Sequence, residues 1–298
     1  MQRNMRLVVL GAAESGVGAA ILALQKGYEV FVSDMGSIKP RYQEMLRKHH
    51  IAFEEGKHTE ELILNADEVV KSPGIPDTAP MVARLIEKGT PILSEIEFAA
   101  RYTDARMIAI TGSNGKTTTT SLIYHILKKA GTDVGLAGNI GHSLALQVAE
   151  TPHSTYVIEL SSFQLDNMYR FRADIAVLLN ITPDHLDRYN FEMQNYVNSK
   201  MRILQNQGPT DSFIYWMEDN YVPQALNERE TAVKRCGFTD EPSEGAVAWA
   251  QNGELVINSP VPFSMPLSQL SLPDKHNLRN SIAAALATPV SYTHRRCR

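Results

Sequence analysis

Residues 108–120 read IAITGSNGKTTTT and join an apolar strand, through a loop with two glycines, to the first turn of a helix. Backbone N–H groups of such a loop, together with the N-terminus of the helix, bind phosphate oxygens. Lys116 can reach the β- and γ-phosphates of a nucleotide, and Thr117 can ligate Mg²⁺. The pattern GxxxxGK[ST] fails at one position, because Ile110 stands where its first glycine belongs. We interpret the stretch as a phosphate-binding loop, since a merely flexible loop does not explain Lys-Thr at a helix start.

The composition excludes several classes of protein. The 298 residues are 43% hydrophobic with 18 Gly and 15 Pro, which excludes disordered and collagen-like chains. At roughly 150 residues per domain the length predicts about two domains, and no apolar run approaches the ~20 residues of a membrane span. A net charge of −4 argues against broad binding to nucleic acid or anionic lipid. Cys236 and Cys297 have no disulfide or zinc-site spacing, so we expect a cytoplasmic protein without zinc.

The first ~95 residues alternate short apolar runs with amphipathic stretches, which predicts a parallel sheet covered by helices. The expected strands are Arg6–Leu10, Glu29–Ser33, which is followed by Asp34, and Glu68–Lys71. The turn at 11–18 has glycines at 11, 16 and 18 and does not match GxGxxG. This partial motif leaves a nucleotide site and a tight strand-to-helix turn equally open.

A second series of strands and helices begins near Ala105, after a segment at 94–103 that we expect to connect two domains. Its strands, expected at 107–110, 134–137, 156–160 and 175–179, are followed by TGSNGKT, GNIG, ELSS and NITPDH. Because ligands of open α/β sheets bind at the carboxyl ends of the strands, these polar ends predict one crevice. The fold class is therefore α/β, with a Rossmann-like N-terminal domain and a P-loop-type doubly wound central domain. Short strands follow residue 207, with a hairpin turn at Asn252-Gly253.

Three residues are candidate metal ligands. Glu159 ends an apolar strand of the same sheet as the loop, where a carboxylate either caps a donor or holds Mg²⁺, and we favour the metal. His185 lies between two aspartates in TPDHLDRY, and we favour a second metal over a surface histidine. Lys200 shares a helical stripe with Met193, Val197 and Leu204 in the helix expected at 191–205. It either snorkels toward solvent or becomes a carbamate that offers oxygen ligands to Mg²⁺.

Three asparagines are ambiguous from the residues alone. Asn139, in GNIG, suits a hydrogen bond to substrate or nucleotide as well as an ordinary turn. Asn277 and Asn280 open a small-residue helix expected at 278–287. Helix N-capping explains Asn277 as well as an adenine contact does.

Taken together, these motifs resemble the Mur ligase family of ATP-dependent peptidoglycan enzymes. KSPGIP (71–76), TGSNGKT (111–117), GNIG (138–141), ELSSFQL (159–165) and TPDHLDRY (182–189) precede Lys200 and the helix at His276-Asn277 in the family's order. The resemblance covers Arg6 to about Ala287 and is closest to the branch that adds D-glutamate. It implies that ATP phosphorylates the carboxylate of UDP-N-acetylmuramoyl-L-alanine and that the D-glutamate amine attacks the acyl phosphate.

The resemblance also implies a role for each matching residue. Lys116, His185 and Lys200 would be catalytic, and Thr117, Glu159, His185 and carbamylated Lys200 would serve Mg²⁺. ATP would contact Gly112, Ser113, Asn114, Gly115, Lys116, Thr117, Thr118, Asn277 and Asn280. The UDP-substrate would contact Glu14, Ser15, Gly16, Asp34, Ser72, Asn139 and Ser161.

The C-terminal end departs from the family pattern. The family has a third domain, and we expect the helix to stop at Thr288-Pro289 and to be followed by a basic tail of doubtful origin. We therefore expect a truncated monomer with a UDP-substrate domain at 1–95, an incomplete ATP domain at 96–287 and the tail at 288–298. Two alternatives stay open: a nucleotide-binding module without turnover, and a folate-type polyglutamate ligase, which would leave KSPGIP without a role.

Overall fold

The computed structural model describes residues 4–259, 262–270 and 274–293, and the chain divides into two compact units. The first comprises residues 1–104, 137–153 and 163–171, and the second comprises 105–136, 154–162 and 172–298. Among the described residues, no helix has the length and apolar character needed to cross a bilayer.

The first unit contains a five-stranded parallel sheet with the order β3-β2-β1-β4-β5. Its strands are β1 (Arg6–Leu10), β2 (Glu29–Asp34), β3 (Ala52–Glu55), β4 (Glu68–Lys71) and β5 (Ile92–Leu93). The central strand β1 is buried along its whole length. The sequence did not reveal β3, because this edge strand, AFEE, is half polar and two of its four residues are exposed. It did not reveal β5 either, which has only two residues.

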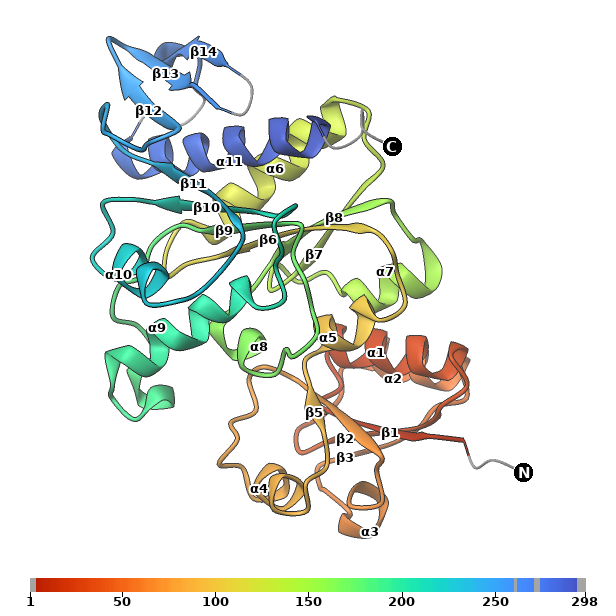
Figure 1. Ribbon diagram of the computed structural model, residues 1–298. Helices are drawn as coiled ribbons and strands as arrows, with labels where there is room; N and C mark the ends of the chain where they lie inside the picture. The colour runs from red at the N-terminus through yellow and green to blue at the C-terminus, as the bar shows by residue number, and fades with distance from the viewer. Residues whose placement is uncertain (1–3, 260–261, 271–273, 294–298) are drawn as a thin grey trace. The chain divides into compact units, whose positions relative to one another are not determined.

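Helices cover both faces of this sheet (Figure 1). They are α1 (Glu14–Gln25), α2 (Pro40–Lys48), α3 (Glu60–Ile63), α4 (Pro80–Glu87) and α5 (Glu95–Ala100), and a further helix, α7 (Leu144–Glu150), packs on α1 and α5. On one face, Ile63 of α3 and Leu85 of α4 share a core with Val8 and Leu10 of β1. On the other, α1, α5 and α7 pack together. The segment at 94–103, which we expected to be a connection, thus contains the buried helix α5 and lies within the first unit.

The second unit is built on a nine-stranded sheet with the order β14-β13-β12-β11-β10-β9-β6-β8-β7. Its strands are β6 (Arg106–Thr111), β7 (Val134–Gly138), β8 (Thr155–Glu159), β9 (Ile175–Leu178), β10 (Ser212–Trp216), β11 (Lys234–Phe238), β12 (Ala248–Gln251), β13 (Glu254–Ile257) and β14 (Phe263–Pro266). The pairings from β8 to β12 are parallel, and β12, β13 and β14 pair antiparallel. The expected hairpin turn is confirmed, since Asn252 and Gly253 both have positive φ between β12 and β13.

Helices also cover this second sheet. They are α6 (Lys116–Lys129), α9 (Met193–Met201), α10 (Val222–Asn227) and α11 (Lys275–Thr293), with short 3₁₀ turns at Leu186–Tyr189, Arg202–Leu204 and Leu267–Gln269. The helices α6 and α11 pack against each other on one face, and α9 and α10 lie on the other (Figure 1). The remaining helix, α8 (Ser162–Asp166), passes from the second unit to the first. The predicted α/β class with a Rossmann-like sheet and a P-loop-type sheet is confirmed.

The helix expected to stop at Thr288-Pro289 continues to Thr293, so that expectation was wrong. Proline lacks the N–H that would bond to the carbonyl four residues earlier, which here belongs to Ala285. The Thr288 hydroxyl shares its single proton between that same carbonyl, at 3.1 Å, and the Ala284 carbonyl, at 3.2 Å. A side chain thereby satisfies the acceptor that Pro289 leaves open.

Candidate nucleotide and substrate sites

The loop between β6 and α6 has a backbone that requires glycine at its last position. Gly115 precedes the first residue of α6 and has φ +82°. A Cβ there would lie 2.3 Å from Oδ1 of Asn280, a buried residue of α11. Both the positive φ and the close approach of α11 therefore exclude a side chain. The contact of Asn280 with adenine stays a prediction.

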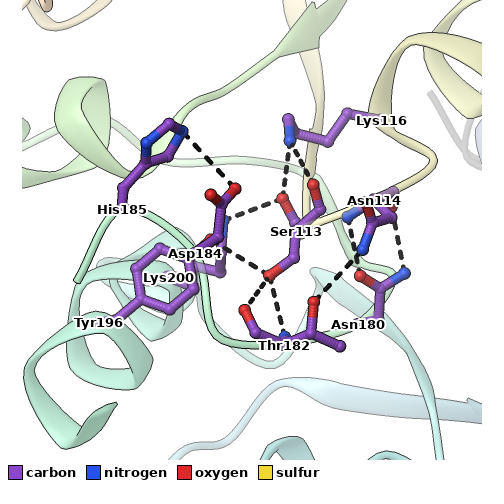
Figure 2. Close-up of polar contacts among 10 residues, drawn as sticks. Ser113, Asn114, Lys116, Asn180, Thr182, Asp184, His185, Tyr196 and Lys200 are labelled. Atoms are coloured by element: carbon purple, nitrogen blue, oxygen red, sulfur yellow. Dashed lines mark hydrogen bonds and ion pairs between the residues drawn. The ribbon is translucent and has the colours of Figure 1, made fainter. Parts of the chain in front are cut away.

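Residues after β9 hold the loop in place (Figure 2). The Ser113 hydroxyl donates to the Thr182 carbonyl and accepts from the Thr182 N–H, both at 2.9 Å. The Asn114 N–H donates to Asn180 Oδ1 at 2.9 Å, and Asn180 Nδ2 donates back to the Asn114 carbonyl at 3.1 Å. The Tyr196 hydroxyl lies 3.1 Å from that of Ser113. Because β6 and β9 are neighbours in the sheet, the two strand ends fix one another.

Two lysines donate hydrogen bonds to the same loop carbonyl, that of Gly112. Lys116 Nζ lies 2.9 Å from the carbonyl oxygens of Gly112 and Ser113, and Lys200 Nζ lies 2.9 Å from that of Gly112. Lys200 is buried, and its Nζ lies 4.7 Å from the centre of the Tyr196 ring. Burial lowers the pKa of Lys116, although the charges of Glu159 and Asp184 act in the opposite direction. Lysine ammonium groups gathered at such a loop favour an anionic ligand.

A buried carboxylate stands beside the start of α6. Glu159 ends β8, is 2% exposed, and accepts a hydrogen bond of 2.8 Å from Thr117 Oγ1. Hydroxyl and carboxylate oxygens are ligands that Mg²⁺ prefers, so these two residues fit the ion. The Thr111 hydroxyl donates to the Leu160 carbonyl at 2.8 Å and ties the two strand ends together.

The other two expected metal ligands, His185 and Lys200, have different neighbours. His185 has φ +50°, and its Nε2 lies 3.5 Å from Asp184 Oδ2, while Lys200 bonds to Gly112 as described. Within residues 4–259, 262–270 and 274–293, no group of three or more His, Cys, Asp and Glu side chains converges on one point. The metal role of His185 and Lys200 stays a prediction.

At the start of α11 the cap is an aspartate. Asn277 donates its backbone N–H to Asp274 Oδ1 at 2.9 Å and its side-chain amide to Asp274 Oδ2. The capping role that the sequence left open for Asn277 was therefore wrong, because the helix begins two residues earlier, at Lys275. The Asn277 side chain accepts from Asn280 Nδ2 at 3.3 Å. Thr118 lies in the first turn of α6.

In the first unit, several predicted substrate residues meet around the turn that follows β1. The Asp34 carboxylate accepts from the N–H groups of Ala12 and Gly36, both at 2.7 Å. A Cβ on Gly11 would lie 2.4 Å from Ser72 Oγ, and one on Gly16 would lie 1.9 Å from the Gly11 carbonyl oxygen. The residues that follow β1, β2 and β4 are thereby packed closely together at the carboxyl edge of the sheet. Gly11 lies at this edge as well, although the predicted substrate residues did not include it.

The remaining predicted substrate residues are more dispersed. The Glu14 carboxylate accepts from the Tyr42 hydroxyl at 3.1 Å and lies 4.0 Å from Arg41, both in α2. Ser15 follows it in α1. Asn139 lies in a turn closed by a 2.8 Å bond from the Gly138 N–H to the His142 carbonyl. Ser161 lies between β8 and α8 in the second unit.

The sequence did not single out Asn180, Thr182 or Tyr196. The first two were visible in NITPDH as polar residues after a strand. Their contact with the loop depends on β9 being the neighbour of β6, which the order of the strands along the chain does not reveal.

Comparisons with known proteins match both units. Residues 110–288 match the Mur ligase middle domain, and residues 6–81 match the MurD N-terminal domain. The UDP-N-acetylmuramoylalanine--D-glutamate ligase of Bacteroides fragilis is 62% identical over 282 residues, covering 95% of this chain and 64% of the relative. The enzyme of that name from Porphyromonas gingivalis is 56% identical over 284 residues, covering 94% and 63%. The chain thus spans less than two thirds of these relatives.

Solved structures share the fold. The UDP-N-acetylmuramate:L-alanyl-gamma-D-glutamyl-meso-diaminopimelate ligase from Neisseria meningitides has a TM-score of 0.67 at 18% identity, covering 97% of this chain and 94% of that one. The UDP-N-acetylmuramate-alanine ligase MurC from Thermotoga maritima has a TM-score of 0.57 at 20% identity, covering 97% and 66%.

Proposed function

The chain belongs to the Mur ligase family, and from this premise we propose that it carries the ATP and UDP-substrate sites of a ligase that adds D-glutamate to UDP-N-acetylmuramoyl-L-alanine. The curated relatives of that name, 56–62% identical, support the choice of substrate. The observation that carries the proposal is the phosphate loop with Lys116 and Lys200 on one carbonyl. The match over residues 6–81 favours this function over a folate-type ligase.

The proposed reaction proceeds through an acyl phosphate. The substrate carboxylate attacks the γ-phosphorus of ATP and ADP leaves. The D-glutamate amine then attacks the acyl carbon, and the tetrahedral intermediate expels phosphate to give the amide. Lys116 would stabilise the negative charge on the transferred phosphoryl group, and the N–H groups at the start of α6 would bind the phosphates of ADP. Ser113 and Asn114 of the loop, which precede α6, are already held by Thr182 and Asn180, so we expect the loop to need little reorganisation when ATP binds.

The proposal includes Mg²⁺ held by Thr117 and Glu159, which are in contact and carry suitable oxygen atoms. The ion would neutralise part of the phosphate charge. His185 and carbamylated Lys200 would serve a second ion. The proposal also includes a cytoplasmic monomer, and the buried free thiol of Cys236 fits a reducing compartment.

The activity test measures phosphate release. The purified chain with ATP and Mg²⁺ should release phosphate only when UDP-N-acetylmuramoyl-L-alanine and D-glutamate are both present. Release with another amino acid in place of D-glutamate would contradict the substrate assignment. Binding of ATP and the UDP-substrate without release would support the module without turnover.

The nucleotide site is tested by Lys116→Ala. Loss of a charge-assisted hydrogen bond to phosphate should raise the Kd of ATP by about 10- to 100-fold in calorimetric titration. Lys128→Ala is the matched control, because Lys128 is an exposed lysine in the last turn of the same helix. Equal ATP affinity of the two variants would contradict the assignment of the loop.

Carbamylation of Lys200 has a spectroscopic test. The neutral amine would add to the carbon of CO₂ and lose a proton, and the product would carry two oxygen atoms in place of the ammonium. Protein equilibrated with ¹³C-bicarbonate should show a carbamate ¹³C resonance that Lys200→Arg lacks and Lys128→Arg retains. A resonance unchanged in Lys200→Arg would reject the assignment.

A further inference from the structure

A row of three hydrogen-bonded side chains lies at the carboxyl edge of the sheet in the first unit. Ser33, fully buried near the end of β2, has its hydroxyl 2.7 Å from Glu54 Oε1 and 2.7 Å from His58 Nδ1. It lies opposite Glu54 in the pairing of β2 with β3. Glu54 also accepts from the Thr59 N–H at 2.8 Å and from the Thr59 hydroxyl at 2.6 Å. These hydrogen bonds are separate from the proposed ATP and Mg²⁺ sites.

The direction of these hydrogen bonds follows from the charge on Glu54. Burial alone would raise the pKa of this carboxyl, but the hydrogen bonds from Thr59 and Ser33 outweigh burial and lower it. An ionised carboxylate only accepts, so the single hydroxyl proton of Ser33 goes to Glu54. Ser33 then accepts from His58, which places a proton on Nδ1.

The other ring nitrogen of His58 is consequently an acceptor. Burial lowers the pKa of His58, against the charges of Glu54 and Asp34, so the ring is neutral at pH 7. A neutral imidazole with its proton on Nδ1 carries a lone pair on Nε2. Among the residues that the structure describes, none hydrogen-bonds to this Nε2. His58 is half-buried, so the lone pair is presented at the protein surface.

The position of His58 matches the nucleoside end of a nucleotide site. The strands run β3-β2-β1 from the edge to the centre, with the Gly11 turn after β1, Asp34 at the end of β2 and His58 in the loop after β3. His58 is near enough to Asp34 for that charge to act on its titration. In such folds phosphates bind at the turn after β1, and the nucleoside lies toward the end of β2.

We propose that His58 Nε2 accepts a hydrogen bond from a nucleoside donor of the UDP-substrate and so contributes to its recognition. The inference rests on the proposed function, because it takes the nucleotide of the first unit to be a uridine diphosphate. A uridine offers three donors, namely the two ribose hydroxyls and the N3–H of the base. Ser33 and Glu54 are positioning residues, since they act only through the tautomer of His58.

The test is calorimetric titration of the full chain with UDP. His58→Asn is the informative variant, because the Asn amide N–H can replace Nδ1–H toward Ser33 while nothing replaces Nε2. We expect the Kd of UDP to rise about 5- to 10-fold, the effect of losing one hydrogen bond. His125→Asn, which changes an exposed histidine of α6 in the second unit, should bind UDP like the unchanged chain.

Three analogues, 2′-deoxy-UDP, 3′-deoxy-UDP and 3-methyl-UDP, identify the donor. The analogue that lacks the recognised donor should bind the unchanged chain 5- to 10-fold more weakly than UDP and should bind His58→Asn no more weakly than UDP does. Ser33→Ala removes the hydroxyl that accepts from Nδ1–H, so both tautomers of His58 become available. This variant should weaken UDP binding less than His58→Asn does.

Each alternative result is informative. An unchanged affinity for UDP in His58→Asn overturns the proposal. The proposal is also overturned if each analogue loses as much affinity relative to UDP in His58→Asn as in the unchanged chain, because His58 would then have a merely structural role. An unchanged chain that binds ATP and no UDP would instead reject the proposed function of the first unit, and the inference with it. Thermal unfolding of each variant verifies that the first unit is folded.

Discussion

At the scale of single residues, Gly115 is a position of the phosphate loop that cannot accept a side chain without strain. Gly115→Ala would place a methyl group against Asn280 in a backbone with φ +82°. We expect a loss of unfolding free energy of about 1–3 kcal/mol and ATP binding weakened at least about 10-fold. Gly131→Ala is the control, because Gly131 has φ +72° with nothing within 4 Å of an added Cβ. If both variants lose the same stability and bind ATP equally, the Asn280 contact has no role.

At the scale of elements, Glu95 of α5 fixes the start of α7. Its buried carboxylate accepts from the Ser143 hydroxyl at 2.7 Å and from the Ala145 N–H at 2.6 Å. Burial raises the pKa of Glu95 and outweighs these hydrogen bonds, which lower it. With a further contribution from the charge of Glu14, the pKa rises from 4.5 to about 7. Between these values the folded protein holds the proton more tightly than the unfolded chain does, so stability falls as the pH rises from 4.5 to 7.

This pH dependence can be measured by denaturant unfolding of the chain between pH 4.5 and 8. The fall in unfolding free energy that Glu95 causes should reach up to about 3 kcal/mol. Glu95→Gln should remove that part of the slope, because its amide does not titrate. Glu150→Gln, at the exposed end of α7, should keep the slope. An identical slope in Glu95→Gln would show that Glu95 does not titrate in this range.

At the scale of the whole molecule, the division into two compact units predicts separable responses to ligands. A ligand stabilises the unit that binds it by mass action. In calorimetric melting, ATP should raise the transition of the second unit and UDP that of the first. Lys116→Ala should abolish the ATP shift and keep the UDP shift. A single transition that both ligands raise equally would show that the units unfold together.

The predictable parts of the structure are those that local pattern determines. β1, the start of α6 at Lys116 and the Asn252-Gly253 turn follow from apolar runs, a glycine loop and a hairpin dipeptide. The helical stripe likewise predicted Lys200 on an inner face, and Lys200 is buried. Strand β3 and the passage of α11 through Pro289 were not predictable in this way. The first depends on pairing with β2, and the second on a threonine hydroxyl at the right turn of the helix.

The sequence by itself determined the α/β class, the phosphate loop and, through the order of five motifs, the family, because these depend on residues close together in the chain. Only the tertiary structure decided which side chains meet. Asn280 against Gly115, Lys200 beside Lys116 on the Gly112 carbonyl, and Ser33 between Glu54 and His58 join residues 21 to 165 positions apart. The physical reason is that strand order, and not sequence order, places the strand ends side by side, and many sequences with the same local periodicity allow different strand orders.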